Sequence, residues 1–144
     1  MIIREMGWED IERVAELEAV SFSVPWSAGM LNDTWKNPAA TCLLAMEGEE
    51  LLGYCALMVV LDEGELCRLG VFPEFKRRGV GSALIDRMIE FMQGQGVHVI
   101  SLEVRENNLP AISLYEKKGF RRIGLRKNYY KKPLENGLTM QREC

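Results

Sequence analysis

The residues best suited to chemistry lie in a glycine-rich turn from Lys76 to Ala83, with the sequence Lys-Arg-Arg-Gly-Val-Gly-Ser-Ala. Its glycines allow the backbone to approach a ligand closely, and free amides at the start of the following helix would point at that ligand. The helix dipole and the three adjacent cations both favour an anion there. The turn therefore predicts a binding site for a pyrophosphate group.

Two familiar phosphate-binding motifs differ from this turn. A P-loop requires Gly-Lys-Ser or Gly-Lys-Thr after its glycine-rich stretch, whereas Gly81 is followed by Ser82 and Ala83. A dinucleotide-binding fingerprint requires a third glycine, and Leu84 occupies that position. The sequence therefore excludes both motifs, and the neighbouring segments must identify the ligand.

The chain carries no pattern for a metal site or for a cysteine nucleophile. Its four cysteines are scattered: Cys42, Cys55, Cys67 and Cys144. The paired ligand spacing of zinc sites is missing, so we expect no metal and regard the first three as small core residues. Strand alternation would place Cys67 on the same face as Leu69, but His98, the only histidine, forms no recognisable pair with it.

Hydrophobic spacing and turn residues predict the elements that position the turn. In the first half of the chain we expect strands at 2–5, 41–47, 51–61 and 65–72, and helices at 8–20 and from Ser27 toward Trp35. Ser27 would cap the short helix. The last three strands, with a turn at Asp62-Glu63-Gly64, would form an antiparallel meander.

In the second half, Gly79 opens a helix that ends near Gly94, and Asn108 caps a helix that runs through Lys118. Strands are expected at 97–104, 120–130 and 138–142, the last two joined through Pro133 and Asn136-Gly137. This order of elements predicts a single α/β domain over residues 1–144, with a mixed sheet and helices on its faces.

Composition excludes several other classes of protein. Of the 144 residues, 47% are hydrophobic and 27% are charged, the balance of a globular protein rather than a disordered or collagenous one. No apolar run approaches the roughly 20 residues that span a bilayer, and the N-terminus lacks a signal pattern. We therefore expect a cytoplasmic protein without a membrane partner.

Positive charge is concentrated toward the C-terminus. The net charge is −3, yet residues 117–132 include eight basic residues and no acidic one. Such asymmetry suggests a polyanionic partner, or simply a solvated basic face. Because the net charge is negative and the sequence contains no recognisable nucleic-acid-binding motif, we expect no direct, sequence-specific binding of nucleic acid.

The segments around the turn resemble the GCN5-related N-acetyltransferases, the GNAT family, over nearly the whole chain. The resemblance rests on Leu69-Gly70-Val71-Phe72-Pro73, on the Arg-Arg-Gly-Val-Gly of the turn, on Leu-Glu-Val-Arg-Glu-Asn-Asn at 102–108 and on 111–120. Residues 22–27, 102–105 and 126–130 are similar, more particularly, to bacterial enzymes that acetylate the N-terminal alanine of a small-subunit ribosomal protein. At 67–71, Cys-Arg-Leu-Gly-Val departs from the family's commoner Asn-Ile-Ala-Val.

The resemblance implies the GNAT acyl-CoA N-acyltransferase fold, a mixed, mostly antiparallel sheet flanked by helices, with acetyl-CoA as co-substrate. Backbone groups that would bind the pantetheine arm and the acetyl carbonyl belong to Leu69, Gly70 and Val71. Amides that would hold the pyrophosphate belong to Arg77, Arg78, Gly79, Val80, Gly81 and Ser82, and Asn108 would also contact the cofactor. Glu103 would be the general base and Tyr115 the general acid. Aromatic residues that could line a peptide groove are Trp26, Tyr129 and Tyr130.

The chemistry of acetyl transfer is consistent with these roles. An α-ammonium group, with a pKa of about 7.7–8.0, loses its proton at pH 7 at a cost of about 1.4 kcal/mol, so one carboxylate can suffice as base. Strand alternation places Glu103 opposite the apolar Leu102 and Val104, although an ion pair with a basic neighbour would also explain it. Tyr115 can donate a proton to the departing thiolate, or it can be an ordinary core tyrosine.

Several functions remain open on this evidence. The leading prediction is acetylation of a protein N-terminus by direct attack in a ternary complex. The same cofactor residues would serve an acetyltransferase acting on a small amine or on a lysine side chain. A non-catalytic acyl-CoA-binding module is the third possibility, and the presence of both Glu103 and Tyr115 argues against it.

Overall fold

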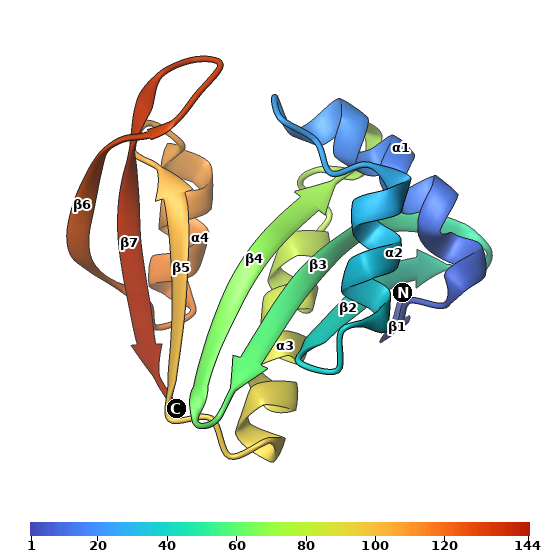
Figure 1. The fold of residues 1–144 in the computed structure, drawn as a ribbon, viewed down its shortest axis with the longest axis horizontal. Helices are drawn as coiled ribbons and strands as arrows, with labels where there is room; N and C mark the ends of the chain where they lie inside the picture. Colours follow the sequence, from blue (N-terminus) through green and yellow to red (C-terminus); the bar gives the residue numbers. More distant parts are fainter.

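A single seven-stranded sheet runs through the molecule, and four α-helices pack on its two faces (Figure 1). The computed structural model describes all residues from 1 to 144. In chain order the elements are β1 (Ile2–Glu5), a 3₁₀ turn (Trp8–Asp10), α1 (Ile11–Ser21), α2 (Ala28–Lys36), β2 (Ala40–Glu47), β3 (Glu50–Val60), β4 (Glu63–Val71), a second 3₁₀ turn (Pro73–Phe75), α3 (Val80–Gly94), β5 (Val99–Arg105), α4 (Leu109–Lys117), β6 (Arg121–Tyr130) and β7 (Glu135–Glu143). None of the helices combines the length and the apolar character that crossing a membrane requires.

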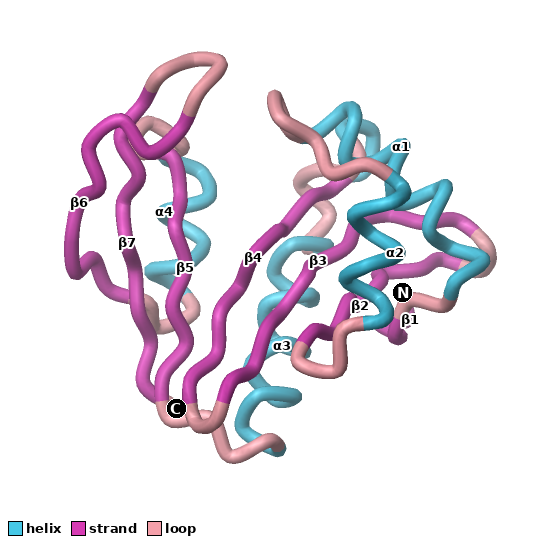
Figure 2. Tube along the Cα trace, viewed as in Figure 1, coloured by secondary structure: helices cyan, strands magenta, loops and turns pink.

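The strand order is β1-β2-β3-β4-β5-β7-β6, and every neighbouring pair is antiparallel except β4 and β5. The expected meander of β2, β3 and β4 is confirmed, as is the mixed sheet. The parallel pair is short: residues 63–66 of β4 face residues 99–102 of β5, and beyond them the two strands diverge. Figure 2 shows the resulting V-shaped opening in the middle of the sheet.

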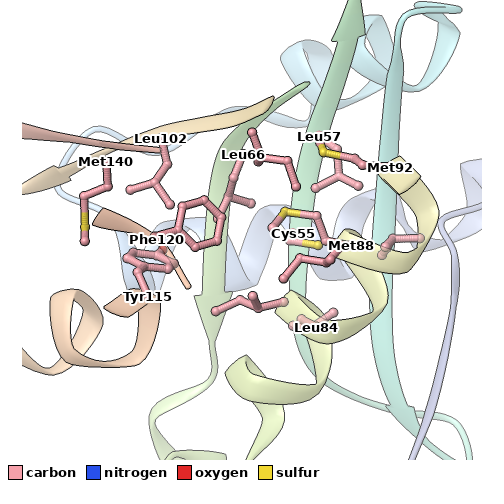
Figure 3. Close-up of a cluster of buried hydrophobic side chains, with 14 of the residues drawn as sticks. Cys55, Leu57, Leu66, Leu84, Met88, Met92, Leu102, Tyr115, Phe120 and Met140 are labelled. Atoms are coloured by element: carbon pink, nitrogen blue, oxygen red, sulfur yellow. The ribbon is translucent and has the colours of Figure 1, made fainter. Parts of the chain in front are cut away.

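Two hydrophobic clusters hold the helices on opposite faces. The larger cluster joins α3 and α4 to the strands, and Figure 3 shows Tyr115 and Phe120 packed in it near Leu66 and Leu102. The smaller cluster joins α1 and α2 to β2 and β3, and includes the fully buried Tyr54. The strands that face both clusters are nearly all apolar, which explains the long hydrophobic runs in the first half of the sequence.

Local signals in the sequence correctly predicted where α2 and α4 begin. The Ser27 side chain accepts a hydrogen bond from the Met30 amide at 3.2 Å, and Asn108 does the same for the Ala111 amide at 3.3 Å. Both are N-caps, because a short polar side chain satisfies an amide that has no partner within the helix. Alternation in β5 is also confirmed, with Ile100, Leu102 and Val104 buried and the intervening residues partly exposed.

Three expected boundaries were wrong. The turn between β3 and β4 lies at Leu61-Asp62 rather than at 62–64, since Leu61 adopts a left-handed φ of 57° and pairing resumes at Glu63. The expected helix at 8–20 begins instead with the 3₁₀ turn. Asn136-Gly137 lies inside β7 rather than in a turn, because Glu135 already pairs with Tyr130 on β6.

Candidate active site

The opening between β4 and β5 leaves backbone groups of β4 without a strand partner. Beyond Leu66, no residue of β4 pairs with β5, although the strand continues to Val71. Backbone amides and carbonyls are obligatory hydrogen-bonding groups, so an unpaired strand edge at a cleft is prepared to bind an extended ligand. Leu69, Gly70 and Val71, which the family resemblance implied as pantetheine contacts, all lie in the stretch whose β5-facing edge is free.

A β-bulge at Cys67 marks the point where the two strands separate. On β3, Ala56 opposes Arg68 and Leu57 opposes Leu66, so Cys67 has no partner. The bulge overturns the expectation that Cys67 and Leu69 share a face, because one extra residue reverses the alternation. Cys67 packs against the α1–α2 cluster, whereas Leu69 packs against the α3–α4 cluster.

The glycine-rich turn leads from β4 into α3 at the wide end of the opening. Gly79 has a φ of 77°, and Arg77 has a φ of 67° although it carries a side chain. The first amides of α3 follow directly, and the side chains of Lys76, Arg77 and Arg78 are exposed around them. Free amides, a helix N-terminus and three cations therefore converge on one exposed loop, as an anion-binding site requires.

Glu103 points from β5 to the face of the sheet that carries α1 and α2. Its carboxylate accepts a hydrogen bond from the Thr139 hydroxyl on β7 and lies 3.7 Å from the Arg126 guanidinium on β6. The side chain is 16% exposed and lines a groove of about 380 Å³ together with Ser101 and Tyr129. The carboxylate is thus oriented by the protein and still accessible to a ligand.

Tyr115 approaches the same opening from the opposite face. It lies on α4, is 6% exposed, and contacts the edge of Phe120 with ring centroids 5.9 Å apart. Burial, with the nearby Tyr130 and Cys55, raises the pKa of its phenol above the ordinary value. The phenol therefore stays protonated well into the alkaline range.

The aromatic residues suggested for a peptide groove lie at the end of β6 and on the loop between α1 and α2. Tyr129 and Tyr130 end β6 and meet edge to face, with ring centroids 5.0 Å apart. Burial chiefly, with the charges of Tyr129 and Glu103, raises the Tyr130 pKa to about 12, while Arg105 and Arg68 oppose this rise. Trp26 lies on the facing loop, with the Arg68 guanidinium 4.8 Å from its ring centroid.

Two arginines that the sequence did not single out hold these loops. Arg105, on β5, donates to the carbonyls of Lys131 and Pro133 and pairs with Glu135 at 3.1 Å, and it also donates to the Ser23 hydroxyl at 3.1 Å. Arg68, on β4, holds residues 22–26. Neither role was visible in the sequence, because the partners lie 26 to 82 residues away. The one local signal was Glu18, a carboxylate on the apolar face of α1.

Comparisons with known proteins identify the family to which this fold belongs. Residues 11–120 match the family described as Acetyltransferase (GNAT) family. The chain therefore belongs to the GNAT family of N-acetyltransferases, and membership implies acetyl-CoA as the acetyl donor.

Two curated relatives and one crystal structure are similar to the chain over most of its length. The chain is 36% identical, over 96% of both chains, to the ribosomal protein bS18-alanine N-acetyltransferase of Haemophilus influenzae. It is 34% identical, over 93% of this chain and 87% of the relative, to N-alpha-acetyltransferase RimI of Mycobacterium tuberculosis. The crystal structure of the ribosomal-protein-S18-alanine N-acetyltransferase from Escherichia coli superposes with a TM-score of 0.91 and 28% identity, covering 99% of this chain and 92% of that one.

The left-handed backbone at Gly79 gives a test of the anion site. In Gly79→Ala the new Cβ has open space, with nothing within 4 Å, so the cost is conformational, about 1 kcal/mol. We expect the turn to relax and acetyl-CoA affinity, measured by calorimetry, to fall about fivefold.

Gly48→Ala is the matched control, because Gly48 has a φ of 59° and equally open space in the β2–β3 turn. It should destabilise the protein to a similar degree and leave acetyl-CoA affinity unchanged. Equal acetyl-CoA affinity in the two variants would contradict the assignment of the anion site.

Proposed function

We propose that this protein transfers the acetyl group of acetyl-CoA to the N-terminal α-amine of a protein, specifically the N-terminal alanine of a small-subunit ribosomal protein. The observation that carries the proposal is the opening between β4 and β5, which has a carboxylate on one face and a phenol on the other. The names of the relatives at 34–36% identity support the choice of acceptor. Such an acceptor would place the reaction in the cytoplasm.

The donor is proposed to lie along β4 on the α3–α4 face. Backbone groups of Leu69, Gly70 and Val71 would hold the pantetheine arm and the acetyl carbonyl. The amides from Arg77 to Ser82 would bind the pyrophosphate. Asn108 is proposed to contribute from the start of α4, although its side-chain oxygen already caps that helix. These contacts would place the thioester carbon in the opening.

The acceptor amine would enter from the other face and lose its proton to Glu103. Thr139 and Arg126 fix the carboxylate, so the base is held before the acceptor arrives. The neutral amine then forms a bond to the carbonyl carbon as the carbon–sulfur bond breaks. Tyr115 supplies the proton that converts the departing thiolate to a thiol. This proton transfer is uphill by about 1.5 pKa units, roughly 2 kcal/mol, because a thiol has a lower reference pKa than a phenol.

Direct attack is favoured over an acetyl-cysteine intermediate. Cys67 is the cysteine nearest the opening along β4, but the bulge turns it toward the α1–α2 cluster. Burial, with Glu65 and Cys42, raises the pKa of its thiol to about 12, so almost no thiolate exists at neutral pH. A thiolate is the nucleophilic form of cysteine, and no histidine is at hand to generate it.

The choice of acceptor is tested by competition between amines. Acetyl-CoA is supplied with short peptides that begin with free Ala, Ser or Met, with N-blocked lysine peptides, and with a small polyamine, and products are weighed by mass spectrometry. We expect acetylation of the α-amine, fastest on alanine. Reaction of the blocked lysine peptides or the polyamine alone would overturn the proposal, and no product at all would favour a binding module.

Removal of the proposed base should change the pH profile. In Glu103→Gln we expect kcat/KM at pH 7 to fall by about 10²-fold or more, and the deficit to shrink as the pH rises past the α-amine pKa of about 8. At high pH the acceptor is already neutral and needs no base. Glu106→Gln, which makes the same change at an exposed carboxylate just beyond β5, is the control. A Glu103→Gln profile identical to the wild type would remove Glu103 as base.

Tyr115→Phe should separate chemistry from donor binding. The phenyl ring keeps the contact with Phe120, so we expect a wild-type melting temperature and acetyl-CoA affinity, with kcat at least tenfold lower. Because the Tyr115 pKa is raised, its protonated form persists as pH increases, and wild-type kcat should show no falling limb up to about pH 10, the ordinary tyrosine value. Unchanged turnover would instead assign Tyr115 to packing.

A further inference from the structure

A buried carboxylate near the end of α1 holds the loop that follows this helix. Glu18 is 0% exposed and is held by three residues. It accepts hydrogen bonds from the Tyr54 hydroxyl, from the Trp26 amide at 2.8 Å, and from Arg68 Nε and Nη2 at 3.1 and 2.6 Å. Every oxygen of this carboxylate is therefore satisfied, and the charge is balanced by one arginine.

A buried ion pair of this kind is weak evidence of a role in stability. Desolvating two charges costs about as much as their attraction returns, and apolar residues of similar volume can replace a buried ion pair without loss. What distinguishes this pair is the segment that it holds. Arg68 also donates to the Val24 carbonyl at 3.1 Å, and its guanidinium lies 4.0 Å from the ring centroid of Phe22. The pair thus fixes residues 22–26 at several points.

Close packing at Gly70 is a second observation that fixes the position of Phe22. A Cβ at Gly70 would lie 3.3 Å from Phe22 Cε2 and 3.4 Å from Ser21 Oγ, closer than most real contacts. The ring that stacks on Arg68 would have to shift by a few tenths of an ångström to admit even a methyl group at position 70.

We propose that Arg68 is a positioning residue for the acceptor: together with Glu18 it fixes residues 22–26 as the β4-side wall of the acceptor groove. This inference rests on the proposed function. The opposite wall is held by Arg105, which also reaches Ser23, so fixing the 22–26 segment sets the spacing of the two walls. Trp26, one of the two aromatic residues of this segment, is held both through its amide and by its ring.

Positioning of the wall predicts a selective kinetic defect. The anion site at 77–82 lies beyond the end of β4, Leu69 to Val71 are held by their pairing with β3, and Glu103 and Tyr115 are held by other elements. Loosening the 22–26 segment should therefore raise KM for a peptide acceptor while leaving acetyl-CoA affinity and kcat nearly unchanged. A merely structural role would lower stability and active-enzyme concentration without changing KM.

The test uses Arg68→Met combined with Glu18→Gln, which removes both charges and leaves no unpaired ion. The control is Arg4→Met combined with Asp10→Asn, an equally bidentate pair whose carboxylate also accepts from a backbone amide, at the other end of α1. We expect KM for an alanine-terminated hexapeptide to rise about tenfold in the first variant, as for one lost charge-assisted hydrogen bond, and to stay unchanged in the control. Amide exchange at residues 22–27 should accelerate only in the first.

Two results would overturn the inference: faster exchange at 22–27 with an unchanged peptide KM, or a loss of acetyl-CoA affinity equal to the rise in KM. If the double variant does not fold, Arg68→Lys decides in its place, since lysine keeps the charge but loses the planar, bidentate contact. A KM equal to that of the wild type in that variant would refute the role. Failure of the wild-type enzyme to acetylate any peptide is a distinct result that refutes the proposed function itself.

Discussion

The divergence of β4 from β5 is the feature on which the rest of the site depends. Parallel strands normally pair along their length, because each unpaired backbone group in an interior costs free energy. Here pairing stops after Leu66 and Leu102, and the bulge at Cys67 comes at the next residue. A bulge bends and twists its strand, so it directs β4 away from its neighbour and leaves the strand edge free for a ligand.

The opening also explains how two substrates can meet without a covalent carrier. Alternation along β5 sends Glu103 to one face, and α4 presents Tyr115 on the other. In the proposed reaction the donor and the acceptor would each occupy one face and contact each other only through the gap. Glu103 and Tyr115 then need no hydrogen bond between them. Each lies in its own surroundings, since the carboxylate lines a groove and the phenol is buried in the hydrophobic core.

Most of the fold could be predicted because its signals are local. Ser27 and Asn108 mark helix starts, Gly79 marks the left-handed turn, and apolar alternation assigns the faces of β5. The bulge at Cys67 could not be predicted in this way, because it exists only in the register with β3 and no glycine or proline marks it. The same applies to Arg68, whose carboxylate partner lies 50 residues earlier in the chain.

In the structure, ion pairs partly neutralise the basic segment from Lys117 to Lys132. Half of its eight cations pair with acidic residues, and the pairs are Lys118–Asp86, Arg121–Glu143, Arg122–Glu116 and Arg126–Glu103. Exposed pairs add little stability, but they reduce the local field that would attract a polyanion. In the proposed reaction the pair with Glu103 matters most, because Arg126, 3.7 Å from the carboxylate, would compete with an incoming ammonium group for it. The electrostatics of this segment would then bear on the proposed acceptor site itself.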